Sequence, residues 1–240
     1  MPVTLAGMAA PLRNDYDDDP DRFLSSEKHE HDDVHPYVAR RFEAAGVRTA
    51  LDVGGGNGKL ARLLAAASIS CLLIDRSPTM LALAPPPKAR ADGARLPAAD
   101  QSVDAVAALY TLYHYDDPLV PIREAYRVLK PGGLFAACAA NRDSDPELAG
   151  IVPNWGEPST FDGEDAPAIV GTVFSAPGDQ VDLDPWDGPL VTLSSVSDAT
   201  AVLRVYSLAP EAAAAAAATL RLPLPLTKRG CVVYATKAAG

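Results

Sequence analysis

The segment Leu51-Asp52-Val53-Gly54-Gly55-Gly56-Asn57-Gly58 constrains the fold of this chain more than any other. A short apolar run at 49–53 leads directly into closely spaced glycines, and residues 57–67 then carry leucines at helical spacing. Glycines at such a turn let backbone amides and a helix N-terminus approach a ligand closely. The sequence therefore predicts a strand, a ligand-binding turn and a helix, as in a nucleotide-binding α/β unit.

The pattern continues along the chain, because apolar runs alternate with helical patterns up to residue 140. Such alternation is typical of βαβ units on a parallel sheet. The predicted strands are 49–53, 70–74, 88–91, 103–109 and 134–139, with helices starting near residues 57, 78 and 118. Residues 141–165 are rich in Pro, Gly and acids and predict a long loop. Beyond them we expect helices at 166–174, 197–208 and 212–218, a possible edge strand at 180–184 and a last strand at 230–236.

Length and charge limit the class of protein. A chain of 240 residues can bury one sizeable core, and a formal net charge of −10 argues against a nucleic-acid-binding surface. No apolar run approaches a membrane span, and the first eight residues lack the basic start of a secretory signal. We expect a cytoplasmic monomer or homodimer that binds a small molecule, with no membrane or nucleic-acid partner. Cys71, Cys138 and Cys231 fall in predicted strands and are expected to be buried free thiols.

The glycine spacing disfavours a dinucleotide. The dinucleotide fingerprint needs glycine at its first, third and sixth positions, and the sixth position counted from Gly54 is Lys59. The spacing therefore disfavours a nicotinamide-dependent oxidoreductase as the function of this chain. The spacing of Asp52, Gly54, Gly56 and Gly58 instead resembles the first motif of class I S-adenosylmethionine-dependent methyltransferases.

Three further matches follow in the family's order. They are Asp75 after the second strand, Asp92 in Ala91-Asp92-Gly93 after the third, and the paired signatures at 102–106 and 124–133. The resemblance implies that Asp75 accepts both ribose hydroxyls, Asp92 accepts the adenine amino group and Asp52 orients the methionine end. From the residues alone, the glycines could form a tight turn without a ligand. Likewise, Asp75 could cap the helix starting at Pro78, and Asp92 could be a turn residue.

The family resemblance also implies a fold and a division of the chain. The expected fold is α/β, a Rossmann-like doubly wound, mostly parallel seven-stranded sheet whose last strand is antiparallel. An N-terminal helical lid would span 1–45, and the methyltransferase domain would span 46–240 with an acceptor-loop insertion at about 141–165. Residues 227–233 look similar to the closing strand of ubiquinone and menaquinone methyltransferases. The implied cofactor-binding residues are Tyr16, Asp52, Gly54, Gly56, Gly58, Asp75, Arg76, Asp92, Gly93 and Leu109.

The methyl acceptor should lie beyond the fourth strand, where ligands of open α/β sheets gather. His114 is the candidate general base there, although a loop histidine can also merely line a pocket or cap a helix. Tyr113 and Trp155 are candidate substrate-binding residues, but Trp155 could instead only pin its loop. Tyr16 could fold over the cofactor or be a surface anchor. His31 and His35 share a helical spacing, yet Pro36 and the lack of a fourth ligand disfavour a metal site.

The expected reaction is in-line methyl transfer from S-adenosylmethionine to an oxygen, nitrogen or carbon atom of a small metabolite, giving S-adenosylhomocysteine. Such a displacement mainly requires that donor and acceptor be positioned and water excluded. The alternative is a methyltransferase-like binding or assembly protein that holds the cofactor without turning it over.

Overall fold

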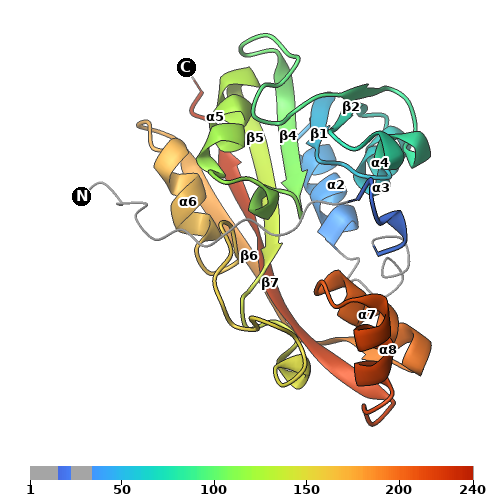
Figure 1. The fold of residues 1–240 in the computed structure, drawn as a ribbon. Helices are drawn as coiled ribbons and strands as arrows, with labels where there is room; N and C mark the ends of the chain where they lie inside the picture. The colour runs from blue at the N-terminus through green and yellow to red at the C-terminus, as the bar shows by residue number, and fades with distance from the viewer. Residues whose placement is uncertain (1–15, 23–33, 240) are drawn as a thin grey trace.

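A seven-stranded sheet organises the part of the chain that the computed structural model describes, residues 16–22 and 34–239 (Figure 1). Its strands lie in the order β3-β2-β1-β4-β5-β7-β6. Neighbours among β1 to β5 pair in parallel, whereas β7 is antiparallel to both β5 and β6. The strands are β1 Thr49–Val53, β2 Ser70–Asp75, β3 Lys88–Arg90, β4 Val103–Leu109, β5 Leu129–Ala140, β6 Gln180–Leu193 and β7 Leu224–Thr236. This confirms the predicted Rossmann-like, mostly parallel sheet with an antiparallel last strand.

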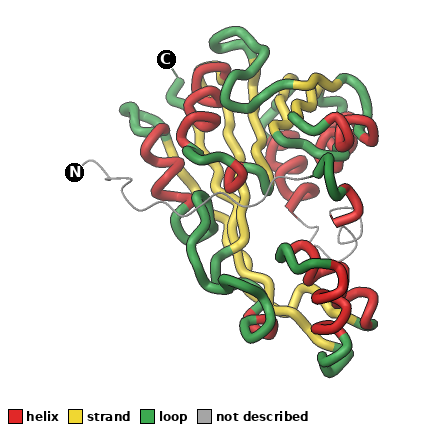
Figure 2. The backbone as a smooth tube through the Cα atoms, viewed as in Figure 1, coloured by secondary structure: helices red, strands yellow, loops and turns green. Residues whose placement is uncertain are grey.

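Helices cover both faces of the sheet (Figure 2). Helices α5 and α6 share one hydrophobic cluster with Leu51 and Val53, whereas α2 and α3 share the opposite cluster with Ala50. Alternate residues of β1 serve opposite faces because successive strand side chains point to opposite sides. The described helices are α2 Val34–Ala44, α3 Lys59–Ala66, α4 Pro78–Leu83, α5 Leu119–Val128, α6 Ala166–Val173, α7 Val196–Val205 and α8 Pro210–Ala217, with 3-10 turns η2 Leu112–His114 and η3 Pro146–Leu148.

Strands β5, β6 and β7 extend well beyond the bounds that the sequence predicted. Helix α5 ends at Val128, and β5 begins at Leu129 because Leu129 pairs with Val103 before a register shift. The predicted short strands 180–184 and 230–236 are parts of two long strands that pair from Gln180↔Thr236 to Leu193↔Leu224. Proline and glycine in both segments concealed this length. Strand β6 tolerates Pro185 and Pro189 because it lies at the sheet edge, where a missing donor costs little.

The outer half of the β6–β7 pair leaves the sheet as a two-stranded ribbon. Strand β5 stops pairing with β7 at Ala140↔Gly230, whereas β6 follows β7 for its remaining length. Helices α7 and α8 and the turn η3 gather around this ribbon at the bottom of Figure 1. Their apolar side chains, with Val191, Leu193 and Leu226 of the ribbon, form a third hydrophobic cluster. We call this unit the cap and the remainder of the sheet with α2 to α6 the body.

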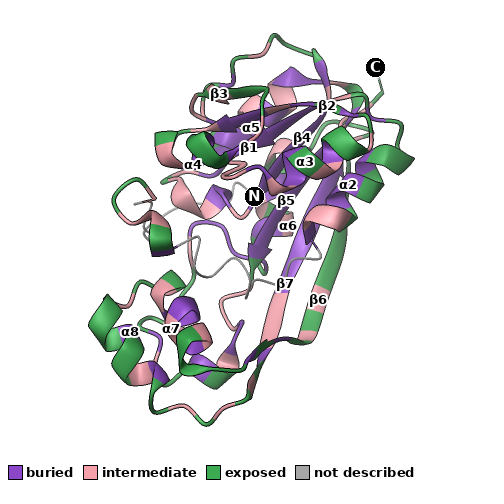
Figure 3. Ribbon diagram, turned by 90° about the vertical axis from the view of Figure 1, so that its right-hand side faces the viewer, coloured by how far each residue is buried: buried purple, intermediate pink, exposed green. Residues whose placement is uncertain are grey.

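The predicted N-terminal lid is described only in part. Residues 23–33, which include His31, lie outside the described residues, as do residues 1–15. Helix α2 buries Val38 and Phe42 in the body core against α3. The central strands of the sheet on which this core is built are coloured purple, as buried, in Figure 3. The division into a lid at 1–45 and a domain at 46–240 stays a prediction, but α2 belongs to the core of the body.

Other expectations concern single residues and the membrane. Cys71, Cys138 and Cys231 are buried, free thiols in β2, β5 and β7, as predicted. Residues 141–165 are loop and turn apart from η3. None of the helices within residues 16–22 and 34–239 has the length and apolar character needed to cross a bilayer.

Candidate active site

A cavity of about 680 Å³ opens between the C-terminal ends of the parallel strands and the cap. One end is lined by the glycine turn after β1 and the ends of β2 and β4. The other end is lined by the loop 141–162, the end of α7 and the start of β7 beyond the sheet. The structure brings the following predicted site residues to this cavity: Tyr16, Asp52, Gly54, Gly56, Asp75, Arg76, Gly93, Leu109, Tyr113, His114 and Trp155. Gly58 and Asp92 do not line it.

The glycine turn is held tightly against neighbouring strands. Gly54 has φ +67° and donates its N–H to the Ile74 carbonyl at 2.7 Å. A Cβ at Gly54 would collide with the Thr111 hydroxyl, and one at Gly55 would lie 2.5 Å from Asp52 Oδ2. Gly58, with φ +87°, is the N-cap of α3, and a Cβ there would lie 2.5 Å from Pro85 Cδ. Gly54 is therefore required by the turn at the cavity, and Gly58 by the packing of the helix start.

Asp75 fixes this turn. Its Oδ2 accepts the Gly56 N–H at 2.9 Å, and its Oδ1 accepts the Ser77 N–H at 2.8 Å. The alternative that Asp75 caps α4 is wrong, because Ser77 is the N-cap and its hydroxyl accepts the Met80 N–H at 3.1 Å. Asp75 is half-buried at the cavity wall, and a ligand there would meet its carboxylate beside the Gly56 backbone.

Asp92 acts in the structure as a turn residue. Its Oδ1 accepts the Ala94 N–H at 2.9 Å, and its Oδ2 lies 3.7 Å from a guanidinium nitrogen of Arg76. That guanidinium lies over the Tyr115 ring at 5.2 Å. Burial and the nearby Asp92 charge raise the pKa of Tyr115 to about 12. Gly93 lines the cavity, and a Cβ there would come within 2.6 Å of the Tyr115 hydroxyl. The cavity wall at this point is thus Arg76, Gly93 and Tyr115.

Asp52 is the most perturbed acid of the site. It is 2% exposed, and its Oδ2 has no hydrogen-bond partner within the protein. The pKa of Asp52 is raised to about 6, chiefly by burial; the nearby His35 lowers it, the Asp75 charge raises it and a hydrogen bond with the Ala61 backbone lowers it. A buried, unpaired carboxylate is costly unless a ligand supplies a donor or a positive charge. The Asp52 side chain therefore fits a cationic ligand at the cavity end beside the glycine turn.

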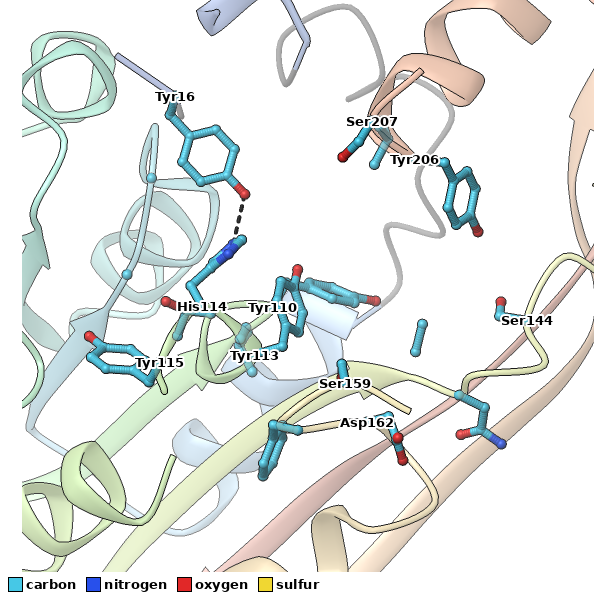
Figure 4. Close-up of a pocket in the computed structure, with 18 of the residues that line it drawn as sticks. Tyr16, Tyr110, Tyr113, His114, Tyr115, Ser144, Ser159, Asp162, Tyr206 and Ser207 are labelled. Carbon is cyan, nitrogen blue, oxygen red and sulfur yellow. Dashed lines mark hydrogen bonds between the residues drawn. The ribbon is translucent and has the colours of Figure 1, made fainter. Parts of the chain in front are cut away.

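Tyr16 and His114 meet across this end of the cavity. The Tyr16 hydroxyl and His114 Nε2 are hydrogen-bonded at 2.9 Å, and the Tyr113 ring lies edge-on to His114 at 4.5 Å (Figure 4). The residues after Tyr16 form hydrogen bonds and an ion pair with both the body and the cap. Asp17 accepts hydrogen bonds from the Ser77 hydroxyl at 2.5 Å and the Thr79 N–H at 3.2 Å, and Asp19 pairs with Arg204 of α7. The segment 16–22 thus bridges the body and the cap.

The cap side carries a buried polar group that the sequence did not predict. Asp145 is fully buried, and its Oδ2 accepts from the Tyr206 hydroxyl and from Lys228 Nζ, the latter at 2.7 Å. Its Oδ1 has no partner within the protein. The loop, α7 and β7 that supply these three residues are far apart in sequence. No local motif could have grouped them.

Backbone strain concentrates at the cavity. Six non-glycine residues in the described ranges have positive φ, and four of them line the cavity: Tyr110, Asp145, Asn154 and Ser207. Such conformations cost roughly 1–3 kcal/mol each and persist where the surrounding structure imposes them. Trp155 is anchored by its indole N–H, which donates to the Ser144 carbonyl at 2.8 Å, so it both pins the loop and lines the cavity. Phe161 also lines the cavity, but it is fully buried in the core of the body.

The glycine turn, the two acids Asp52 and Asp75 and the sheet order agree with one known family. Residues 51–137, from β1 to most of β5, match the family described as a methyltransferase domain. These residues are a class I S-adenosylmethionine-dependent methyltransferase domain. Membership of this family implies S-adenosylmethionine as the cofactor, and the unpaired Asp52 fits its positive charge.

Known proteins extend the methyltransferase comparison. An uncharacterized methyltransferase of Mycobacterium ulcerans is 37% identical over 105 residues, which are 41% of this chain and 41% of the relative. A SAM-dependent methyltransferase of Archaeoglobus fulgidus has a similar structure, with 19% identity, a TM-score of 0.60 and coverage of 90% of this chain and 99% of that one. The cyclase SpnF is similar with 21% identity, a TM-score of 0.62 and coverage of 98% and 89%.

These similarities have limits. At 19% and 21% identity the two solved structures show the shared fold alone. The matches span 41% to 50% of the length of the curated relatives. The more specific resemblance to ubiquinone and menaquinone methyltransferases stays a prediction.

Proposed function

We propose that this chain transfers a methyl group from S-adenosylmethionine to a small molecule held between the methyltransferase domain and the cap. One observation carries the proposal: a single cavity joins the glycine turn of that domain to a chamber lined by the cap. A cofactor at one end and an acceptor at the other would then share one cavity. Holding two reactants in this way removes much of the entropic barrier to an in-line displacement.

The cofactor would be held by the body. When bound, S-adenosylmethionine supplies an electrophilic methyl group on a positively charged sulfur. Asp75, with the Gly56 backbone beside it, is placed to accept hydrogen bonds from ribose hydroxyls. Asp52 would balance positive charge at the methionine end, since its Oδ2 lacks a partner. Arg76, Gly93 and Leu109 form the wall that remains for the adenine, with Asp92 acting through Arg76.

The acceptor would be held by η2 and the cap. In this proposal His114, whose Nε2 is hydrogen-bonded to Tyr16, takes a proton from an acceptor that must lose one. Tyr113 and Trp155 would bound the acceptor with their rings, while Tyr16 and the segment after it keep water out. A base of this kind contributes about 10²–10⁴-fold to a rate.

Calorimetry with S-adenosylmethionine tests the cofactor site. We expect Asp75→Ala to weaken binding at least about tenfold. The variant removes the carboxylate that would accept hydrogen bonds from the ribose, and it also removes the hydrogen bond from the Gly56 N–H that holds the glycine turn. The control is Asp182→Ala, which removes an exposed acid of β6 that pairs with Arg41 away from the cavity. Unchanged affinity in Asp75→Ala would remove Asp75 from the ribose site.

Turnover separates an enzyme from a binding protein. Metabolite extracts incubated with the protein and methyl-labelled S-adenosylmethionine should contain a labelled product that His114→Ala forms much more slowly, with cofactor affinity unchanged. The similarity to a cyclase makes this test necessary, because one fold hosts several chemistries. Cofactor binding without any labelled product across broad extracts would favour the non-catalytic alternative.

A further inference from the structure

The cap-side end of the cavity is rich in acids whose charge is not balanced. Three basic side chains there, Arg142, Lys228 and Arg229, all line the cavity and all form ion pairs. Their acidic partners are twice as many: Asp143, Asp145, Asp162, Glu164, Asp165 and Asp187. A ligand entering this end therefore meets cations that are already paired with carboxylates, together with the two acids of this set that line the cavity, Asp145 and Asp162.

Two of these acids line the cavity and keep one oxygen without a partner. Asp162 is 3% exposed, and its Oδ1 accepts from Arg142 and from the backbone N–H groups of Glu164 and Asp165, each at 3.1 Å. Its Oδ2 has no hydrogen-bond partner within the protein. Asp145 repeats the pattern, because Tyr206 and Lys228 both bond to Oδ2 and leave Oδ1 unpartnered.

These oxygens call for hydrogen-bond donors. A buried carboxylate oxygen without a donor costs roughly 1–3 kcal/mol, or more because it is charged. The hydroxyl groups of Tyr206 and Ser207 lie across the cavity from Tyr16 and His114 in Figure 4, and Asp162 lies beside Ser159. Tyr206 is a fixed donor to Asp145, because burial and the Asp145 charge raise its pKa well above the usual value.

We propose that the cap-side end of the cavity binds an amine, as its protonated ammonium form, through Asp162 and Asp145. The acceptor of the proposed methyl transfer would then be an amine-bearing small molecule, so this inference rests on the proposed function. An ammonium group supplies N–H donors and a positive charge together, which are what the two carboxylate oxygens without a partner require. A carboxylate would face the same two acids and find no unpaired cation among Arg142, Lys228 and Arg229.

The chain provides its own optical probe for this end. Both of its tryptophans, Trp155 and Trp186, line the cavity, so its tryptophan emission reports ligands there. We would titrate the full chain with benzylamine, benzyl alcohol and benzoate, which share a ring and differ in the polar group. Benzylamine should bind at least about tenfold more tightly than benzoate, with benzyl alcohol between them. Equal or tighter binding of benzoate, or no binding of benzylamine, overturns the proposal.

Asp162→Asn is the sharpest variant. The amide oxygen of asparagine can keep the bonds that Oδ1 now accepts from the Glu164 and Asp165 N–H groups, while the amide NH2 replaces the unpartnered Oδ2. Benzylamine affinity should fall about tenfold, and benzoate affinity should stay or rise. Glu164→Gln is the matched control, because it removes the same charge from the Arg142 ion pairs but does not line the cavity. An equal loss of benzylamine affinity in both variants would contradict a specific role for Asp162.

Cofactor calorimetry on the same samples separates this inference from the proposed function. Both variants should bind S-adenosylmethionine as the unmodified chain does, which also checks that they are folded. If methyl transfer occurs but benzoate is preferred to benzylamine, the amine proposal fails and the proposed function stands. If benzylamine is preferred but no methyl transfer is found, the amine-binding end stands and the proposed function fails.

Discussion

The body and the cap meet at the same cavity but are built in different ways. In the body, the glycine turn and the acids of the cavity lie at or just after the C-terminal end of a strand, as Gly54 follows β1 and Asp75 ends β2. In the cap, one buried group joins Asp145, Tyr206 and Lys228 from three separate parts of the chain. The difference shows that a cofactor site can be built from residues at the ends of successive βα units. Acceptor recognition, by contrast, depends on long-range packing.

The largest effect expected from a single substitution lies in the body. Gly54→Ala places a methyl group against the Thr111 hydroxyl at a backbone conformation with φ +67°. The clash and the strain together should weaken S-adenosylmethionine binding about 100-fold in calorimetry. Gly150→Ala, on an exposed cap turn with open space around it, is the control and should bind normally. Normal cofactor binding by Gly54→Ala would contradict the role of the turn.

The next largest expected effect is a pH dependence of cofactor affinity, which arises from Asp52 in the body. The pKa of Asp52 is raised to about 6, so above pH 6 the folded chain holds an unfavourable buried charge without its ligand. A bound cation favours the ionised form, so affinity for S-adenosylmethionine should rise about tenfold from pH 5 to pH 7. Asp52→Asn should bind weakly and remove this dependence. An unchanged pH profile in the variant would assign the titration to another group.

The raised pKa of Asp52 also predicts how the free energy of unfolding changes with pH. A folded pKa above the unfolded value of 3.8 means that the neutral acid is favoured in the folded state. The destabilisation is absent below pH 3.8, grows as the pH rises, and reaches about 3 kcal/mol above pH 6. Without cofactor, Asp52→Asn should therefore be more stable than the unmodified chain at pH 7.5 in urea unfolding and similar to it at pH 4.

The smallest effect distinguishes the cap from the body. Tyr206→Phe removes one hydrogen bond to Asp145 but leaves Lys228, so the free energy of unfolding should fall by about 1 kcal/mol. The pKa of Tyr206 lies well above its usual value, so this loss should be the same from pH 6 to pH 9. Cofactor affinity should not change. The control for the stability measurement is Tyr37→Phe, at an exposed tyrosine of α2. A fall in cofactor affinity with Tyr206→Phe would show that the cap-side end of the cavity is coupled to the cofactor end.

The parts of the fold that were predicted well depend on short stretches of sequence. Strands β1 and β4 have their predicted bounds, β2 is one residue longer than predicted, and α4 begins at Pro78 as expected. Each of these carries an apolar run or a helix-start signal within a few residues. The start of β5 was predicted at residue 134 but lies at Leu129, because Leu129 pairs with Val103, a contact that no local pattern reveals.

The sequence by itself determined the body of this protein, because a strand, a glycine turn and a helix are specified by neighbouring residues. It also brought the acids Asp52 and Asp75 to the same edge, since parallel strands end together. Only the tertiary structure decided that Ser77 rather than Asp75 caps α4, and that Asp92 turns toward Arg76. It also decided that β6 and β7 extend into a cap enclosing Asp145 and Asp162. The physical reason is that burial, pairing and charge balance depend on neighbours in space, which the spacing of residues along the chain does not reveal.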